Sequence, residues 1–170
     1  MDFYKLCRAR YSVRKFAETP VEEAQLLRIL ETGASAPTAK NLQPQRIYVL
    51  KSREAMDMLR GITRCAFNAP MALLVCADVR EAWVNPFNGR SSAEMDASIV
   101  ASQMMLQAAE LGLGSTWCCW VDFAKIKEAF QLPEEVEPYC LLPLGYPAHD
   151  CIPSGQHTVR KPLAETVTEI

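Results

Sequence analysis

Apolar and polar positions alternate along this chain in blocks that predict helices interspersed with short strands. Apolar residues recur at helical spacing in five segments, which predicts helices over residues 2–9, 19–33, 53–61, 93–111 and 124–132. In the second of these, Thr19 is the expected cap, Pro20 suits the first turn and Gly33 ends the helix. Runs rich in β-branched and other apolar residues predict strands over residues 46–50, 71–78, 115–122 and 139–146.

The order of these elements indicates one layered domain. Residues 71–78, MALLVCAD, are apolar on both faces, so this strand is expected in the centre of the sheet. Strands mixed with helices in this order give an α+β or α/β structure. The chain has 170 residues, no internal repeat and no evident linker, and we expect a single domain over residues 1–170.

The segment 93–111 is the clearest helix, and its apolar arc is wider than a surface helix needs. Asp96, Gln103, Gln107 and Glu110 fall on one polar stripe, and apolar side chains occupy most of the remaining circumference. Two interpretations stay open: a central helix of a monomer, or a helix buried against both its own core and another subunit.

Composition excludes several classes of protein. The formal net charge of −2 provides no basic field for nucleic acid, so we expect no nucleic-acid partner. No segment approaches the roughly 20 apolar residues of a membrane span, and the charges near the N-terminus are too closely spaced for a secretory signal. Seven cysteines, an odd number, lie mostly in apolar runs, which indicates free thiols rather than a disulfide framework. We therefore expect a cytoplasmic protein that needs no membrane.

The stretch RYSVRKF, residues 10–16, is the first candidate for binding chemistry. If it is extended, Arg10, Ser12 and Arg14 lie on one side, and Tyr11 and Val13 on the other. Two guanidinium groups flanking a hydroxyl suit a phosphate. The alternative is a solvated basic edge strand.

The polar loop 34–44, ASAPTAKNLQP, is the second candidate. Thr38, Lys40, Asn41 and Gln43 lie between Pro37 and Pro44, which stiffen the loop, and such a loop can present amides and hydroxyls to a polar ring or a sugar chain. A simple connector between a helix and a strand would have a similar composition.

The third candidate is GLGSTWCCW, residues 112–120. It follows a helix and precedes a strand, which reverses the order required by the dinucleotide fingerprint. Adjacent Cys118 and Cys119 on a strand point to opposite faces, so they are unsuited to chelating one metal or forming an unstrained disulfide. His149, Cys151 and His157 lack paired-ligand spacing, and we expect no metal site. No nucleophile with a base partner is evident either.

Taken in order, these motifs resemble the FMN-dependent nitroreductase family. The resemblance is carried by residues 10–16, 36–44, the Ala-rich helix leading into 112–117, LGYP at 144–147 and RKPL at 160–163, and it extends from about Phe3 to the C-terminus. It implies an α+β, three-layer α/β/α fold with a central, mostly antiparallel sheet in an intertwined homodimer with two FMN molecules at the subunit interface.

The resemblance also implies the cofactor-binding residues. Arg10, Ser12 and Arg14, with Tyr11 in the same motif and Arg160 from the tail, would hold the phosphate and ribityl chain. The second subunit would contribute Pro37, Thr38, Ala39 and Asn41, with Gln43 nearby. Trp117, Cys118 and Cys119 would line the isoalloxazine ring, with a backbone N–H facing flavin N5. No side chain is assigned as a catalytic proton donor.

The implied activity is that of an FMN-dependent NAD(P)H oxidoreductase. In a ping-pong reaction, NADH or NADPH delivers hydride to FMN, and a small electron-poor acceptor such as a nitroaromatic or a quinone then takes the electrons. Residues 80–90 are the candidate cover over the flavin, with Trp83 and Phe87 shaping the acceptor pocket. One alternative is a flavin-binding storage or sensor module with little turnover, and another is a thiol or zinc protein.

Overall fold

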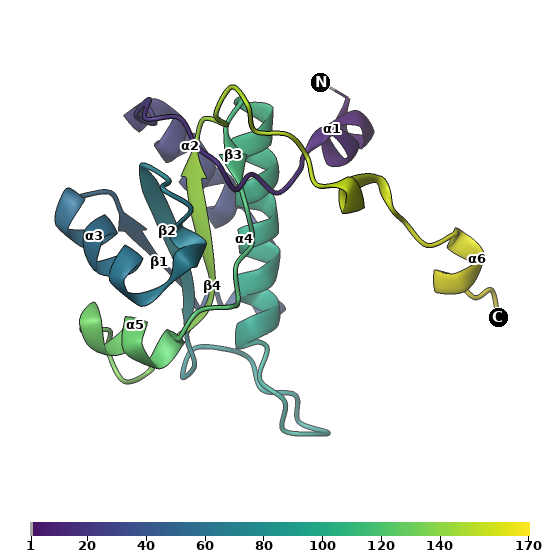
Figure 1. The fold of residues 1–170 in the computed structure, drawn as a ribbon. Helices are drawn as coiled ribbons and strands as arrows, with labels where there is room; N and C mark the ends of the chain where they lie inside the picture. Colours follow the sequence, from purple (N-terminus) through teal and green to yellow (C-terminus); the bar gives the residue numbers. More distant parts are fainter. Residues whose placement is uncertain (1) are drawn as a thin grey trace.

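The computed structural model describes residues 2–170 and contains helices on both faces of a four-stranded sheet (Figure 1). The α-helices are α1 Phe3–Ala9, α2 Glu23–Ala34, α3 Arg53–Ile62, α4 Ala93–Glu110, α5 Phe123–Ala129 and α6 Leu163–Thr166. Short 3-10 helices are η1 Ala39–Asn41, η2 Arg64–Ala66 and η3 Gly155–Thr158. The strands are β1 Gln45–Leu50, β2 Met71–Asp78, β3 Gly114–Ser115 and β4 Val136–Gly145.

The sheet has the order β1-β2-β4-β3, and every pair of neighbouring strands is antiparallel. All eight residues of β2 are buried, which confirms the prediction that this apolar run lies in the centre. An isolated parallel bridge between Ser12 and Ser115 places the N-terminal extended segment beside β3. The expected α+β fold with a mostly antiparallel sheet is therefore confirmed.

Alternate residues of β2 contribute to two cores, which makes the architecture three layers. Leu73 and Val75 pack in the core formed with α2 and α4, and Leu74 and Cys76 pack in the core formed with α3 and α5. This follows from the period of two along a strand, since successive side chains point to opposite faces. A strand that is apolar at every position requires cover on both sides.

Four of the predicted elements have wrong bounds. The helix expected over 124–132 ends at Ala129, and the strand expected from residue 139 begins at Val136. The strand expected over 115–122 is reduced to Gly114–Ser115, followed by a single bridge between Cys118 and Leu141. The helix expected from Thr19 begins at Glu23, where Glu22 is the cap: its carboxylate accepts the Gln25 backbone N–H, and the Gln25 side chain accepts the Glu22 N–H. This reciprocal capping box satisfies two N–H groups that a helix start leaves open, which a threonine cap alone does not do.

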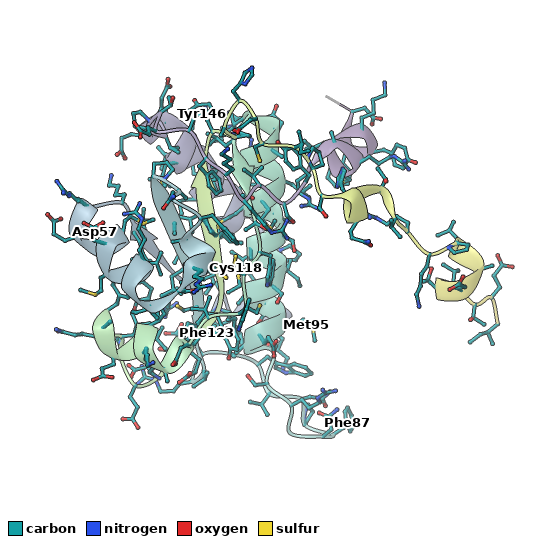
Figure 2. The ribbon with its side chains drawn as sticks, in the orientation of Figure 1. Asp57, Phe87, Met95, Cys118, Phe123 and Tyr146 are labelled. Atoms are coloured by element: carbon teal, nitrogen blue, oxygen red, sulfur yellow. The ribbon has the colours of Figure 1, made fainter. Side chains whose placement is uncertain are left out.

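Three segments extend from the layered body. Helix α1 and the C-terminal segment carrying η3 and α6 lie to one side, and the connection between β2 and α4 extends past the start of α4 (Figure 1). Phe87 lies at the tip of that connection and is 95% exposed (Figure 2). Within residues 2–170, no helix is both long enough and apolar enough to span a bilayer.

Candidate functional site

Five of the predicted cofactor residues line one pocket of about 210 Å³, which we call the arginine pocket. Arg10, Tyr11, Ser12 and Arg14 reach it from the N-terminal extended segment, and Arg160 reaches it from the C-terminal segment. The phosphate-binding residues inferred from RYSVRKF and from the tail are thus adjacent in space, although about 150 positions separate them in the sequence.

The N-terminal segment is fixed against the sheet by its backbone. The Val13 N–H donates to the Ser115 carbonyl at 3.0 Å, and Val13 itself is buried. Close contact is possible because residue 114 is glycine: a Cβ there would lie 2.5 Å from the Val13 side chain. With Val13 turned inward, alternation along the extended chain leaves Ser12 and Arg14 facing the pocket.

The C-terminal segment closes the other wall of the pocket. The Ala148 N–H donates to the Lys15 carbonyl at 3.0 Å, and the Tyr11 hydroxyl donates to the Cys151 carbonyl at 3.4 Å. Burial raises the pKa of Tyr11, so this hydroxyl is a donor at neutral pH. Further along, a ring nitrogen of His157 lies 3.1 Å from the Arg8 carbonyl.

The cations of the arginine pocket have no carboxylate partner. Across residues 2–170, no ion pair within 4.0 Å involves Arg10, Arg14 or Arg160. Guanidinium groups present forked donors that match phosphate oxygens, and such charge-assisted bonds are stronger than neutral ones. Arg14 and Arg160 each donate to a neighbouring backbone carbonyl, and no carboxylate among residues 2–170 pairs with any of the three guanidiniums. Three guanidiniums and a serine hydroxyl around one hollow therefore fit an organic phosphate.

The Trp117–Cys119 segment continues from β3, next to the arginine pocket. Cys118 pairs with Leu141 in both directions, its N–H donating at 3.0 Å and its carbonyl accepting at 2.9 Å. In an antiparallel bridge the flanking peptides face away from the partner strand. Neither the Trp117 nor the Cys119 N–H has an acceptor among residues 2–170, so this edge offers free main-chain donors.

The two adjacent cysteines have opposite environments. The Cys118 thiol lies in the core with α3 and α5, and burial raises its pKa to about 12 (Figure 2). The Cys119 side chain is exposed and accepts a hydrogen bond from the Trp117 indole N–H at 3.0 Å. Cys118 therefore contributes its backbone rather than its sulfur to anything bound along this edge.

The loop 37–43 is well built but lies elsewhere in the fold. The Gln43 N–H donates to the Thr38 hydroxyl at 3.1 Å, and the Ala39 N–H donates to the buried Asp96 carboxylate at 2.9 Å. Lys40, Asn41 and Gln43 all have positive φ, a backbone conformation that is uncommon for residues other than glycine. Pro37, Asn41 and Gln43 are exposed, and Thr38 and Ala39 are half-buried.

Helix α4 separates this loop from the arginine pocket. Asp96, in the first turn, holds Ala39, whereas Ala109, in the last turn, lies in a small cavity beside Arg10. Thirteen residues of helix rise about 20 Å. Within one chain, the predicted phosphate residues and the predicted loop residues therefore do not form one site.

The segment 80–90 is also at the Asp96 end of α4, away from the arginine pocket of its own chain. It forms a hairpin in which Val84 bridges Ser91 and the Asn85 N–H donates to the Arg90 carbonyl at 2.9 Å. Trp83 and Ala39 line a hollow of about 600 Å³ next to this hairpin. From this position, segment 80–90 does not cover the arginine pocket of its own chain.

Three further residues line the arginine pocket and were not predicted to bind the cofactor: Ser154, Gln156 and His157. The Ser154 hydroxyl accepts the Gln156 N–H at 3.3 Å and caps η3, which turns the chain toward Arg160. A polar Ser-Gly-Gln-His stretch shortly before an assigned arginine was the available signal. Among residues 2–170, no group of three or more His, Cys, Asp or Glu side chains is placed to hold a metal.

A family model described as the nitroreductase family matches residues 7–70 and 63–146 of this chain. A curated protein of Methanothermobacter thermautotrophicus, provisionally named NADH dehydrogenase/NAD(P)H nitroreductase, is 28% identical over 162 residues, which cover 88% of this chain and 80% of that protein.

Solved structures agree. A nitroreductase family protein from Clostridium difficile 630 is 38% identical, with a TM-score of 0.92 over 99% of this chain and 98% of that one. A nitroreductase-type protein of Exiguobacterium sibiricum 255-15, solved in complex with FMN, has a TM-score of 0.86 at 21% identity over 100% of this chain and 98% of its own. At that identity the second similarity shows a shared fold.

Proposed function

This chain belongs to the nitroreductase family and is an NAD(P)H oxidoreductase, and from that premise we propose that it uses FMN to reduce small electron-poor aromatic acceptors. The observation that carries the proposal is the arginine pocket, in which three guanidiniums surround Ser12 and, among residues 2–170, pair with no carboxylate. The FMN bound to the Exiguobacterium sibiricum relative supports the same cofactor here.

Each residue group has a role toward the cofactor. Arg10, Arg14 and Arg160 would bind the phosphate, and Ser12 would donate to the adjoining ribityl chain. The free N–H groups of Trp117 and Cys119 would face the ring, where donors near N5 stabilise the reduced form. When bound, FMN would supply the redox chemistry between NADH or NADPH and a nitroaromatic or a quinone. The protein's part is binding and orientation.

We propose that the functional unit is a homodimer, because the site is incomplete in one chain. The loop carrying Thr38, Ala39 and Asn41 lies about 20 Å along α4 from the arginine pocket, given the 1.5 Å rise per residue. A second copy related by a twofold axis would bring its loop to the first copy's pocket. The exposed side of α4, which includes Met95, is available for this contact (Figure 2).

The C-terminal segment supports the same arrangement. Ile152, Val159, Leu163 and Val167 are all exposed along a segment that extends away from its own chain (Figure 1). Apolar side chains left in solvent at this density mark an interaction surface. A second chain is the partner that the proposal assigns to it.

The test is anaerobic stopped-flow spectroscopy of the FMN-loaded protein, mixed separately with NADH and NADPH. An oxidoreductase is expected to lose its yellow colour within seconds and to regain it when menadione or a nitroaromatic is added. A protein that binds FMN but bleaches only over many minutes would instead be a storage or sensor module. Light scattering of the same sample measures the mass, and a mass of one chain would contradict the dimer.

A further inference from the structure

We propose that the hollow beside the 83–91 hairpin is the binding site for the ring of the electron acceptor, and that Asn85, Asn88 and Arg90 select rings bearing uncharged acceptor oxygens. The hollow has a volume of about 600 Å³, within the range of small-molecule sites. This inference rests on the proposed function, because it assumes that a flavin lies nearby.

The hollow adjoins the loop that the dimer would bring to the flavin. Ala39 belongs both to that loop and to the lining of the hollow, so a ligand there would lie beside whatever the loop contacts. Trp83, half-buried, and Met95, largely exposed, supply apolar surface for a flat ring. The hairpin and the first turns of α4 thus border a space large enough for a ring, and this space is open to solvent in a single chain.

The asparagines present hydrogen-bond donors. Asn85 Oδ1 accepts the Phe87 N–H at 2.9 Å, and Asn88 Oδ1 accepts the Arg90 N–H at 3.0 Å, so both oxygens are used in turns. The amide NH₂ groups have no acceptor among residues 2–170. Each amide oxygen is held in its turn by one accepted bond, and the NH₂ group beside it can donate to a ligand.

Charge in the hollow is balanced. Arg90 lines it, and Glu94, in the first turn of α4, lines it as well. One cation and one carboxylate leave little net attraction for an anion. Selection therefore depends on donors matched to neutral oxygens, as in a nitro group or a quinone carbonyl, and a site built of donors discriminates strongly against a ring that lacks them.

The hairpin holds these groups in place before a ligand arrives. The Gly89 N–H donates to the Asn85 carbonyl at 2.8 Å, and the Ser92 N–H donates to the Trp83 carbonyl at 2.8 Å. A framework ordered in advance loses less entropy when it binds a ligand.

The test is the double variant Asn85→Asp/Asn88→Asp, which retains the turn-forming oxygens and removes both NH₂ groups. Its matched control is Asn68→Asp, the same chemical change at an exposed position outside the hollow. Isothermal titration of the oxidised, FMN-loaded protein with menadione measures equilibrium affinity without turnover. We expect about tenfold weaker menadione binding in the double variant, as for one or two lost hydrogen bonds, and no change in the control.

Bleaching of the flavin by NADH is measured on the same samples, because the nicotinamide carboxamide also carries an uncharged carbonyl. Weaker menadione binding, with or without slower bleaching, supports the inference. Unchanged menadione affinity overturns it. If bleaching by NADH is slower while menadione affinity is unchanged, the hollow binds the electron donor instead. Failure of the wild-type protein to bleach would count against the proposed function, and the titration would still decide the role of the hollow.

Discussion

Asp96 in α4 holds the backbone of Ala39 in place: its Oδ1 accepts the Ala39 N–H at 2.9 Å, and the carboxylate is almost fully buried. Its other oxygen accepts the Ser92 hydroxyl at 2.7 Å, at the start of the same helix. One carboxylate therefore joins the predicted cofactor loop to the helix that carries the hairpin hollow.

Replacing Asp96 with alanine should destabilise both the fold and the loop. The Ala39 N–H and the Ser92 hydroxyl lose their acceptor, and an unsatisfied buried polar group costs about 1–3 kcal/mol. The free energy of unfolding, measured with urea, should fall by about 2 kcal/mol. Asp96→Asn, which retains an acceptor oxygen for Ala39, should lose less than half as much; equal losses for the two variants would show that the bond to Ala39 contributes little.

Arg160→Met should weaken FMN binding and leave riboflavin binding unchanged, because riboflavin lacks the phosphate. A charge-assisted hydrogen bond is worth about 1.5–3 kcal/mol, which corresponds to a 10- to 150-fold higher dissociation constant for FMN. Flavin fluorescence quenching measures both affinities. Arg53→Met, on the exposed side of α3, is the control. Equal losses for FMN and riboflavin would place Arg160 at the ring rather than at the phosphate.

Gly114→Ala should disrupt the arginine pocket, because Gly114 lies against Val13 in the extended segment that carries Ser12 and Arg14. The new Cβ would lie 2.5 Å from Val13 Cγ2, so the extended segment would have to shift, with a cost of about 1–3 kcal/mol. Unfolding midpoints should fall, and FMN affinity should fall with them. Val13→Ala in the same chain should restore part of both. Gly61→Ala, in α3 with open space around it, should instead be neutral or slightly stabilising.

The adjacent cysteines should differ in reactivity toward iodoacetamide. Cys119 is exposed and should be alkylated within minutes, whereas Cys118 should remain unmodified until the protein unfolds, because its thiol is buried and its pKa is raised to about 12. Mass spectrometry of peptides resolves the two positions. Added FMN should slow the labelling of Cys119 if the ring covers that edge. Labelling unaffected by FMN would count against that placement.

Stability should fall as the pH rises above about 9. Burial raises the pKa of Cys76 and of Cys118 to about 12 each from an ordinary value of 9.0, and it raises the pKa of Cys140 as well. Between these limits the unfolded chain releases protons that the folded chain keeps, so alkali favours unfolding. In this pH range each thiol lowers the free energy of unfolding by about 1.4 kcal/mol per pH unit. Urea unfolding at pH 8 and pH 10 measures it, and Cys118→Ala should reduce the slope.

The layers of the fold could be predicted from sequence because the signals were local. An unbroken apolar run gave a central strand at Met71–Asp78, and helical spacing gave α4 within a residue or two. Alternation in an extended segment predicted that Arg10, Ser12 and Arg14 share a face, and all three line the arginine pocket, but Tyr11, predicted on the opposite face, lines it as well. Arg160 was assigned to the same pocket only through the family resemblance.

Features that depend on tertiary contacts were missed. The stretch after Ser115 has the composition of a strand, but within residues 116–122 strand pairing is limited to the bridge between Cys118 and Leu141. Pairing rather than propensity decides where a strand ends. Nothing in the sequence places Asp96 against Ala39, since they are 57 residues apart and in contact only after folding. The hollow depends on the hairpin between Val84 and Ser91, where the sequence indicated only a loop.

The separation of the two half-sites along α4 has a genetic consequence. If each complete site draws its arginines from one chain and its loop from another, a pair formed by an Arg14-defective chain and an Asp96-defective chain contains one site with both defects and one with neither. Two inactive alleles expressed in the same cell would then complement each other, with at most half the activity of a normal pair recovered in each mixed one.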